Sequence, residues 1–151
     1  MSTADIDQHN LQPGLPHLAA KSGLLEWHRI AAERDWDSLP QLLADDVRFR
    51  NPAATDAYFG KAPMVAILRT VFAVMEDFQY RRHFGSATGY VMEFTARVGN
   101  ELLIGVDIVE FNVDGKITDF MVMIRPASAV LALAEEAGRR MAAAQAPSSN
   151  R

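Results

Sequence analysis

The sequence predicts an α+β domain in which helices lie on one face of a curved antiparallel sheet. In the N-terminal half, apolar residues recur at helical spacing. From Phe78 to Arg125, apolar and polar residues instead alternate in short stretches separated by turn residues. Helices that precede a run of strands are typical of domains with this layered arrangement. A chain of 151 residues is long enough to form one such domain with a sizeable core.

Four helices are predicted, three of them before the run of strands that begins at Phe78, and they cover residues 17–34, 38–44, 61–75 and 129–144. In the first, Leu24, Trp27 and Ala31 share an apolar side. Asp37 and Ser128 precede the second and the last helix, and we expect both to be N-caps.

Strands are predicted over residues 47–50, 78–84, 90–98, 103–111 and 116–125. Asn51-Pro52 ends the first strand, and Gly99-Asn100 and Asp114-Gly115 provide hairpin turns between the last three. The flanking segments are rich in polar or small residues, so we expect 1–16 to be a flexible arm and 145–151 a loose tail. The single domain would then cover 17–144.

Composition excludes several functional classes. The net charge is -4 and no basic stripe is present, which argues against a nucleic-acid surface. The absence of cysteine excludes disulfides, thiolate nucleophiles and cysteine-ligated metals. Without a secretory signal or an apolar run of about 18 residues, we expect a cytoplasmic protein that binds no membrane. With no His pair at metal-ligand spacing, no Gly-rich phosphate loop and no Lys in a Schiff-base context, we expect neither metal nor cofactor.

Asp107 is the candidate functional residue that stands out. It interrupts the apolar stretch from Leu103 to Phe111 in the middle of a predicted strand. A carboxylate removed from water changes its pKa, finds partners or takes part in chemistry. We therefore interpret Asp107 as an acid or base in a pocket, the alternative being a structural carboxylate that is hydrogen-bonded within the sheet.

The order of these elements, with the residues at their junctions, resembles the nuclear transport factor 2-like superfamily, which includes ketosteroid isomerases, SnoaL-like polyketide cyclases and limonene epoxide hydrolase. The matching pieces are 34–37, 43–49 leading into Asn51-Pro52, Gly60 before a helix, 106–111 and 114–117. The resemblance covers about 23–125. It implies a cone-shaped curved sheet with three N-terminal helices packed on its concave face, plus a C-terminal helix.

The resemblance also assigns candidate catalytic residues. Asp107 falls where ketosteroid isomerase keeps a protonated carboxylic acid. Asn51 occupies the position of that enzyme's base and Trp27 that of its oxyanion tyrosine, so both side chains would position a substrate oxygen. In ordinary structural roles, Asn51 would end its strand and Trp27 would belong to the core. Compared with limonene epoxide hydrolase, Asn51 and Asp107 match two groups that hold the attacking water, but the second acid is replaced by Val122.

A cavity wall of aromatic and aliphatic side chains is expected around these residues. Strand alternation predicts that one face of residues 90–98 and one face of the last strand point to the same side of the sheet, where they can line a cavity. The alternative is that these side chains fill a solid core. The candidate substrate-binding residues are Phe49, Tyr58, Tyr90, Met92, Phe94, Phe120, Val122 and Ile124. Such a wall suits an apolar, cyclic ligand with one or two polar groups.

Three hypotheses follow for function. The first is an isomerase, cyclase or hydratase with Asp107 as acid or base, and the second is a binding protein for an apolar ligand. Epoxide opening by water held at Asn51 and Asp107 is a variant of the first, and the third is an accessory dimer with a filled core. Met121 and Met123 form an apolar stripe on the opposite sheet face, and the superfamily commonly dimerises there, so we expect a homodimer.

Overall fold

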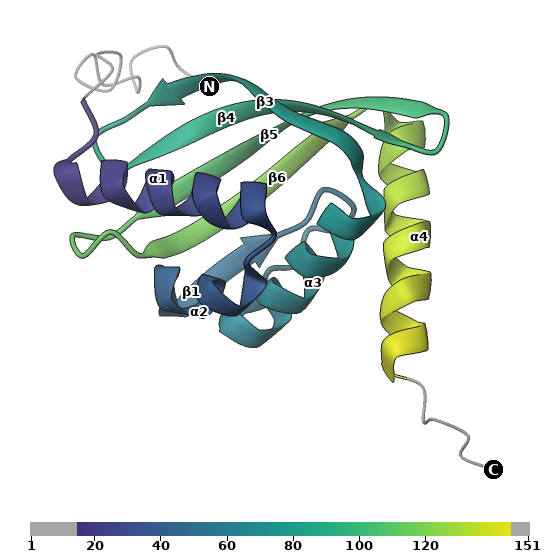
Figure 1. Cartoon of the computed structure of the whole chain (residues 1–151), viewed down its shortest axis with the longest axis horizontal. Coiled ribbons are helices and arrows are strands. Elements are labelled where there is room, and N and C mark those ends of the chain that lie inside the picture. Colours follow the sequence, from purple (N-terminus) through teal and green to yellow (C-terminus); the bar gives the residue numbers. More distant parts are fainter. Residues whose placement is uncertain (1–14, 146–151) are drawn as a thin grey trace, which may run out of the picture.

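The computed structural model describes residues 15–145, which form one curved six-stranded sheet with helices on one face and at one end (Figure 1). The elements follow in the order α1 (Leu18–Glu33), the short 3-10 helix η3 (Trp36–Ser38), α2 (Leu39–Leu42), β1 (Leu43–Arg50), β2 (Tyr58–Phe59), α3 (Lys61–Val74), β3 (Glu76–Gly85), β4 (Gly89–Val98), β5 (Glu101–Phe111), β6 (Ile117–Arg125) and α4 (Ala127–Gln145). This architecture confirms the predicted fold class. The proposed arm up to residue 14 and the tail from residue 146 lie outside the described residues.

The strand order is β2-β1-β6-β5-β4-β3. Neighbouring strands are antiparallel except β1 and β6, which pair in parallel with Phe49 opposite Phe120. The sequence analysis predicted a purely antiparallel sheet and did not foresee this pair, because β1 lies far from β6 in the chain. The parallel pairing is what brings the end of β1, with Asn51 just beyond it, next to the central strands.

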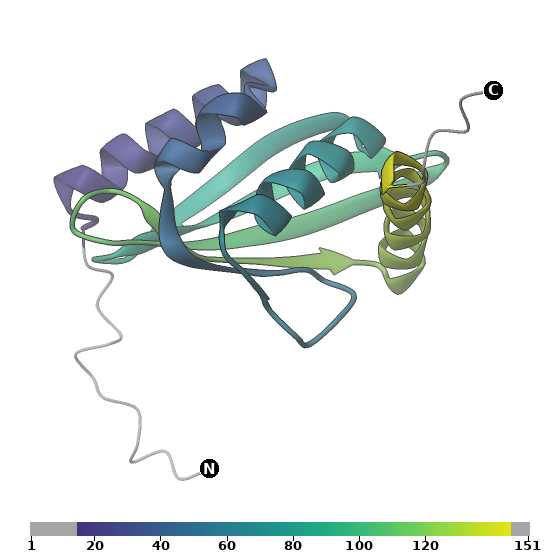
Figure 2. The same cartoon turned by 90° about the horizontal axis from the view of Figure 1, so that it is seen from below.

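The helices cover one face of the sheet, as the view from below shows (Figure 2). Helices α1, α2 and α3 lie on the same side, and α4 stands across one end of the sheet beside α3 (Figures 1 and 2). The largest fully buried side chains include Trp27 from α1, Phe49 from β1, Phe94 from β4 and Phe120 from β6. The core therefore lies between the concave face of the sheet and the helices. No helix within residues 15–145 is long and apolar enough to cross a bilayer.

Both predicted N-caps and one predicted helix end were wrong. Asp37 lies inside η3, and α2 has no side-chain cap. Helix α2 ends at Leu42 rather than residue 44, because Leu43 already pairs with Ile117 of β6 and both side chains are buried. Ser128 lies inside α4 instead of capping it, and its Oγ donates to Glu101 Oε2 at 3.2 Å. The side chain that caps α1 is His17, whose Nδ1 accepts from the Ala20 amide at 3.0 Å.

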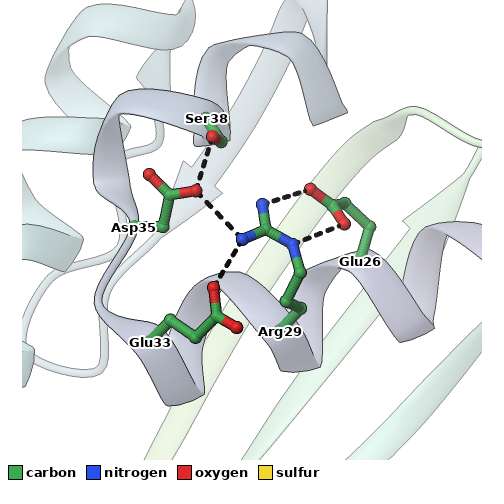
Figure 3. A network of polar contacts seen from close by, with 5 residues as sticks. All are labelled: Glu26, Arg29, Glu33, Asp35 and Ser38. Carbon is green, nitrogen blue, oxygen red and sulfur yellow. Dashed lines mark hydrogen bonds and ion pairs between the residues drawn. The ribbon is translucent and has the colours of Figure 1, made fainter.

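A network around Arg29 fastens the end of α1 to the turn that follows (Figure 3). The guanidinium donates to Glu26 at 2.6 and 2.9 Å, to Glu33 at 2.7 Å and to Asp35 at 3.0 Å. Ser38 donates to the same Asp35 oxygen at 2.6 Å, and these bonds lower the pKa of Asp35. The contacts lie at the surface, so they orient the turn more than they stabilise the fold.

Gly105 in β5 allows an aromatic side chain to cross the strand. A Cβ at this position would lie 2.4 Å from Phe94 Cζ and 2.7 Å from the Met123 carbonyl oxygen. Gly105 pairs with Phe94 on one side and with Ile124 on the other. The missing side chain therefore lets the Phe94 ring lie over β5, two residues before Asp107.

Candidate functional site

A chain of hydrogen bonds connects Asp107 to the helix layer. The Tyr80 hydroxyl, from β3, donates to Asp107 Oδ2 at 2.6 Å. Trp27 Nε1, from α1, donates to the Tyr80 oxygen at 2.9 Å. Three elements that are distant in sequence thus place a carboxyl, a phenol and an indole in a line, with Asp107 at its sheet end.

Burial dominates the electrostatics of this chain. Asp107 is 4 % exposed and is the only polar or charged residue in the buried set of residues 15–145. Burial raises the pKa of Asp107 from its ordinary value of 3.8 to about 7, although the hydrogen bond from Tyr80 acts in the opposite direction. Burial and the Asp107 carboxylate raise the pKa of Tyr80 well above its usual range. Tyr80 therefore keeps its proton and remains a donor while Asp107 titrates near neutral pH.

Asp107 lines a small cavity of about 50 Å³, called here the inner cavity. Its walls are almost entirely apolar and include Phe78, Phe94 and Phe120, and among residues 15–145 Asp107 is the single titratable residue that lines it. Oδ2 is bonded to Tyr80, whereas no residue within 15–145 hydrogen-bonds to Oδ1. One carboxyl oxygen is thus fixed by the protein, and the other has no hydrogen-bond partner among the described residues.

The predicted wall residues occupy three different places. Five line the inner cavity: Phe49, Phe94, Phe120, Val122 and Ile124. Tyr58 lies further out, at a second pocket. Tyr90 and Met92 are buried but line neither, and the Tyr90 ring instead packs edge-on against Phe111 with ring centres 6.4 Å apart. They share the concave face with Phe94 but lie further along β4, which strand alternation alone does not reveal.

Asn51 lines the inner cavity and also makes a local turn. Its Oδ1 accepts from the amides of Ala53 at 2.9 Å and Ala54 at 3.0 Å. This is the strand-ending role that the sequence allowed. The two backbone bonds fix the orientation of the amide, and no described residue accepts a hydrogen bond from its NH₂ group. That group remains able to donate to a ligand oxygen.

The structure places Trp27 behind Tyr80 and not at the cavity wall. Its side chain is fully buried, with the ring centre 5.1 Å from that of Phe120. Its indole N–H donates to Tyr80, so Trp27 positions the tyrosine that in turn positions Asp107.

Tyr80 is the hydrogen-bond partner of Asp107 that the sequence analysis missed. The signal was present, because the alternation from Phe78 to Phe84 places Phe78 and Tyr80 on the same strand face. Tyr80 pairs with Phe94, the residue whose ring lies beside Asp107. The alternation does not reveal the register between β3, β4 and β5, so it could not show that Tyr80 reaches Asp107.

His28 lies beside the hydrogen-bonded row of Trp27, Tyr80 and Asp107, with its ring centre 5.0 Å from that of Tyr80. Burial lowers its pKa, and His83 lowers it further. It lines neither the inner cavity nor the pocket outside it. Across residues 15–145, no three His, Asp or Glu side chains are grouped so as to hold a metal ion.

A second pocket of about 170 Å³, called here the outer pocket, lies between α3 and α4. The inner cavity and the outer pocket share five lining residues: Asn51, Pro52, Ile67, Val71 and Leu133. The two spaces are therefore neighbours, and α4 forms one wall of the outer one.

Comparison with known proteins gives a consistent set of similarities. The model of the SnoaL-like domain matches residues 24–120. A structure from Pseudomonas aeruginosa described as a steroid delta-isomerase is 43% identical, with a TM-score of 0.85 over 89% of this chain and 99% of that one. An uncharacterized Silicibacter pomeroyi protein with a cystatin-like fold is 33% identical, with a TM-score of 0.76 over 80% and 85% of the two chains. SalBIII, an epoxide hydrolase/cyclase-like enzyme of salinomycin pyran ring formation, shares the fold at 15% identity (TM-score 0.61, 73% and 92% covered). No curated protein matches the chain significantly.

Proposed function

The chain belongs to the SnoaL-like domain family, and from this premise we propose that it is a small-molecule isomerase in which Asp107 transfers a proton. The observation that supports the proposal is a buried carboxyl with a pKa near 7, which accepts a hydrogen bond from Tyr80 at one oxygen and belongs to a residue that lines an apolar cavity. A general acid or base is most effective when its pKa is close to the working pH. The similarity to a protein described as a steroid delta-isomerase points to the same class of reaction.

A single carboxyl is sufficient for an isomerisation that moves one proton within the substrate. In its ionised form, Asp107 would take a proton from a carbon next to a carbonyl group, and the electron pair would move toward the carbonyl oxygen. The same carboxyl would return the proton to another carbon of the conjugated system, which restores the carbonyl and regenerates the carboxylate. No second acid is consumed, so the single titratable residue of the inner cavity is compatible with this reaction.

Asn51 would stabilise the negative charge that develops on the substrate oxygen. Its amide is fixed by the Ala53 and Ala54 amides, so its NH₂ group is an oriented donor at the cavity wall. Oriented donors in a site without water stabilise developing charge strongly.

Binding without turnover is the second candidate. The observation that favours it is that Asp107 has no other titratable side chain beside it in the inner cavity. In such a protein Asp107 and Asn51 would only hydrogen-bond a ligand oxygen. Epoxide opening is less well supported than isomerisation, because Val122 lies opposite Asp107 where a second acid would be needed.

A titration of Asp107 followed by carboxyl-carbon NMR tests the basis of both candidates. We expect an apparent pKa near 7, assigned by the loss of the signal in Asp107→Asn. A value near 4 would contradict the desolvated site and the proposed proton transfer. If the pKa is near 7, enolisable ketones with a neighbouring double bond are the substrates to assay, with turnover expected to increase with pH through the same value.

We also propose that two copies pair through the outer face of the sheet. This face exposes Leu102 (73 %), Ile104 (45 %) and Met123 (50 %), and Met121 is partly exposed beside them. The strand register places these residues on the side opposite to Asp107. A contiguous apolar face of this kind commonly marks an interface.

Met123→Glu is expected to convert the dimer to a monomer. A charge buried without a partner costs several kcal/mol, so dimer dissociation should increase by about 100-fold or more. Light scattering coupled to gel filtration measures the mass. Val113→Glu, in an exposed turn away from this face, is the control and should leave the mass unchanged. A natural chain that runs as a monomer at high concentration would contradict the proposal.

A further inference from the structure

We propose that the outer pocket holds the apolar tail of the same ligand whose oxygen binds at Asp107. The inference deepens the proposed function, on which it rests. It assigns the ligand to a chemical class, namely elongated, uncharged molecules with one oxygen-bearing end.

The first argument is size. Pockets for organic ligands usually measure about 300–1,000 Å³, whereas the inner cavity measures only about 50 Å³. A ligand that reaches Asp107 must therefore extend beyond that cavity. The outer pocket, about 170 Å³, is the neighbouring space, and it shares Asn51, Ile67, Val71 and Leu133 with the inner cavity.

The second argument is the chemistry of the lining. Aliphatic residues of α3 and α4 make up most of the outer pocket, and Asn51 and Tyr58 are its polar members. None of the charged residues within 15–145 lines it. An aliphatic or aromatic tail therefore fits this space, whereas a phosphate or carboxylate would find no partner.

The third argument is how α4 keeps the space open. Ala134, Ala137 and Gly138 face the outer pocket with the smallest side chains available. Gly138 is exposed, and a Cβ added there would meet no atom within 4 Å, so a larger side chain can be introduced at this edge of the pocket without a clash. Gly in a helix interior is unfavourable by about 1 kcal/mol relative to Ala, so Gly138 is not explained by helix stability. Leu133 is buried and lines both spaces, so it lies at the boundary between them.

The test compares the binding of phenol and 4-butylphenol by calorimetry. The phenol group is the probe for Asp107 and the butyl chain is the probe for the outer pocket. Each buried methylene contributes about fourfold in affinity, so 4-butylphenol should bind the natural chain on the order of 100-fold more tightly than phenol. Gly138→Leu should reduce this ratio to near one, because the added side chain occupies the space of the butyl chain. Leucine has a higher helix propensity than glycine, so a reduced affinity ratio could not be attributed to unfolding of α4.

Ala143→Leu is the matched control. It adds the same side chain to an exposed position of α4 that lies outside the outer pocket, and it should preserve the ratio. A ratio near one in the natural chain, or one that Gly138→Leu leaves unchanged, would overturn the inference.

The pH dependence of phenol affinity distinguishes failure of the proposed function from failure of the outer-pocket proposal. If Asp107 holds the phenol oxygen, phenol affinity changes with pH around 7 and this change disappears in Asp107→Asn. If Gly138→Leu removes the preference for 4-butylphenol over phenol but phenol affinity does not change with pH, the outer pocket is supported as a ligand site and the role of Asp107 is refuted. If the affinity for phenol depends on pH but the butyl chain adds no affinity, the role of Asp107 is supported and the outer pocket is refuted as a ligand site.

Discussion

At pH 8, Asp107→Asn is expected to be more stable than the natural chain by about 4 kcal/mol. The pKa of Asp107 is about 7 in the folded protein and close to 3.8 in an unfolded chain. At pH 8 the natural protein must hold an ionised carboxylate in an apolar cavity, whereas Asn is neutral. A difference of about three pKa units corresponds to about 4 kcal/mol.

The sign of this effect depends on pH. Below about pH 4, Asp107 is protonated in both states and adds no penalty. Between about pH 4 and 7 the unfolded chain releases the proton while the folded chain keeps it, so the free energy of unfolding decreases as pH rises. Above pH 7 both states are ionised and the penalty is complete. The stability that Asp107→Asn gains over the natural chain should therefore be small at pH 4 and largest at pH 8.

Urea denaturation at pH 4 and pH 8 measures the difference. Asp46→Asn is the control, because Asp46 is an exposed aspartate and the same change there should have little effect at either pH. Equal stability of Asp107→Asn and the natural chain at pH 8 would show that Asp107 is not desolvated. If the proposed reaction is right, the stabilised variant should also lose about 10²- to 10⁴-fold in turnover. A residue that costs stability and supports activity is the usual compromise at a functional site.

Tyr80→Phe is expected to raise the pKa of Asp107 and to destabilise the protein. The Tyr80 hydroxyl stabilises the ionised carboxyl through the 2.6 Å bond to Oδ2. Hydrogen bonds to charged groups contribute about 1.5–3 kcal/mol, so their loss should raise the pKa by about one to two units. The change also leaves Trp27 Nε1 buried without its acceptor, which costs about 1–3 kcal/mol of unfolding free energy.

Carboxyl-carbon NMR and thermal unfolding measure the two effects separately. Tyr90→Phe removes the same hydroxyl from a buried tyrosine that makes no hydrogen bond to Asp107 or Trp27, and it should leave the Asp107 pKa unchanged. In a turnover assay, the inflection near pH 7 should move to higher pH in Tyr80→Phe and not in Tyr90→Phe. An unchanged pKa in Tyr80→Phe would show that the tyrosine has only a structural role.

The sequence by itself determined the fold class and the central residue. Helical spacing in the segments before Phe78 and alternation from Phe78 onward were sufficient for an α+β domain, because both periodicities follow from local backbone geometry. Asp107 was identifiable because a carboxylate within an apolar strand is costly wherever that strand lies. The apolar alternation of β4 and β6 likewise identified Phe94, Phe120 and Val122 as members of one face.

Only the tertiary structure decided which residues meet Asp107. Tyr80 reaches it because the register of β3, β4 and β5 places that hydroxyl beside Oδ2, and register depends on pairing between distant segments. Trp27 lies one hydrogen bond further away, since the packing of α1 on the sheet directs its indole to Tyr80. The outer pocket depends on how α4 packs against α3, which no spacing in either helix specifies. Periodicity fixes which side of an element faces inward, whereas long-range packing fixes which inward-facing side chains touch.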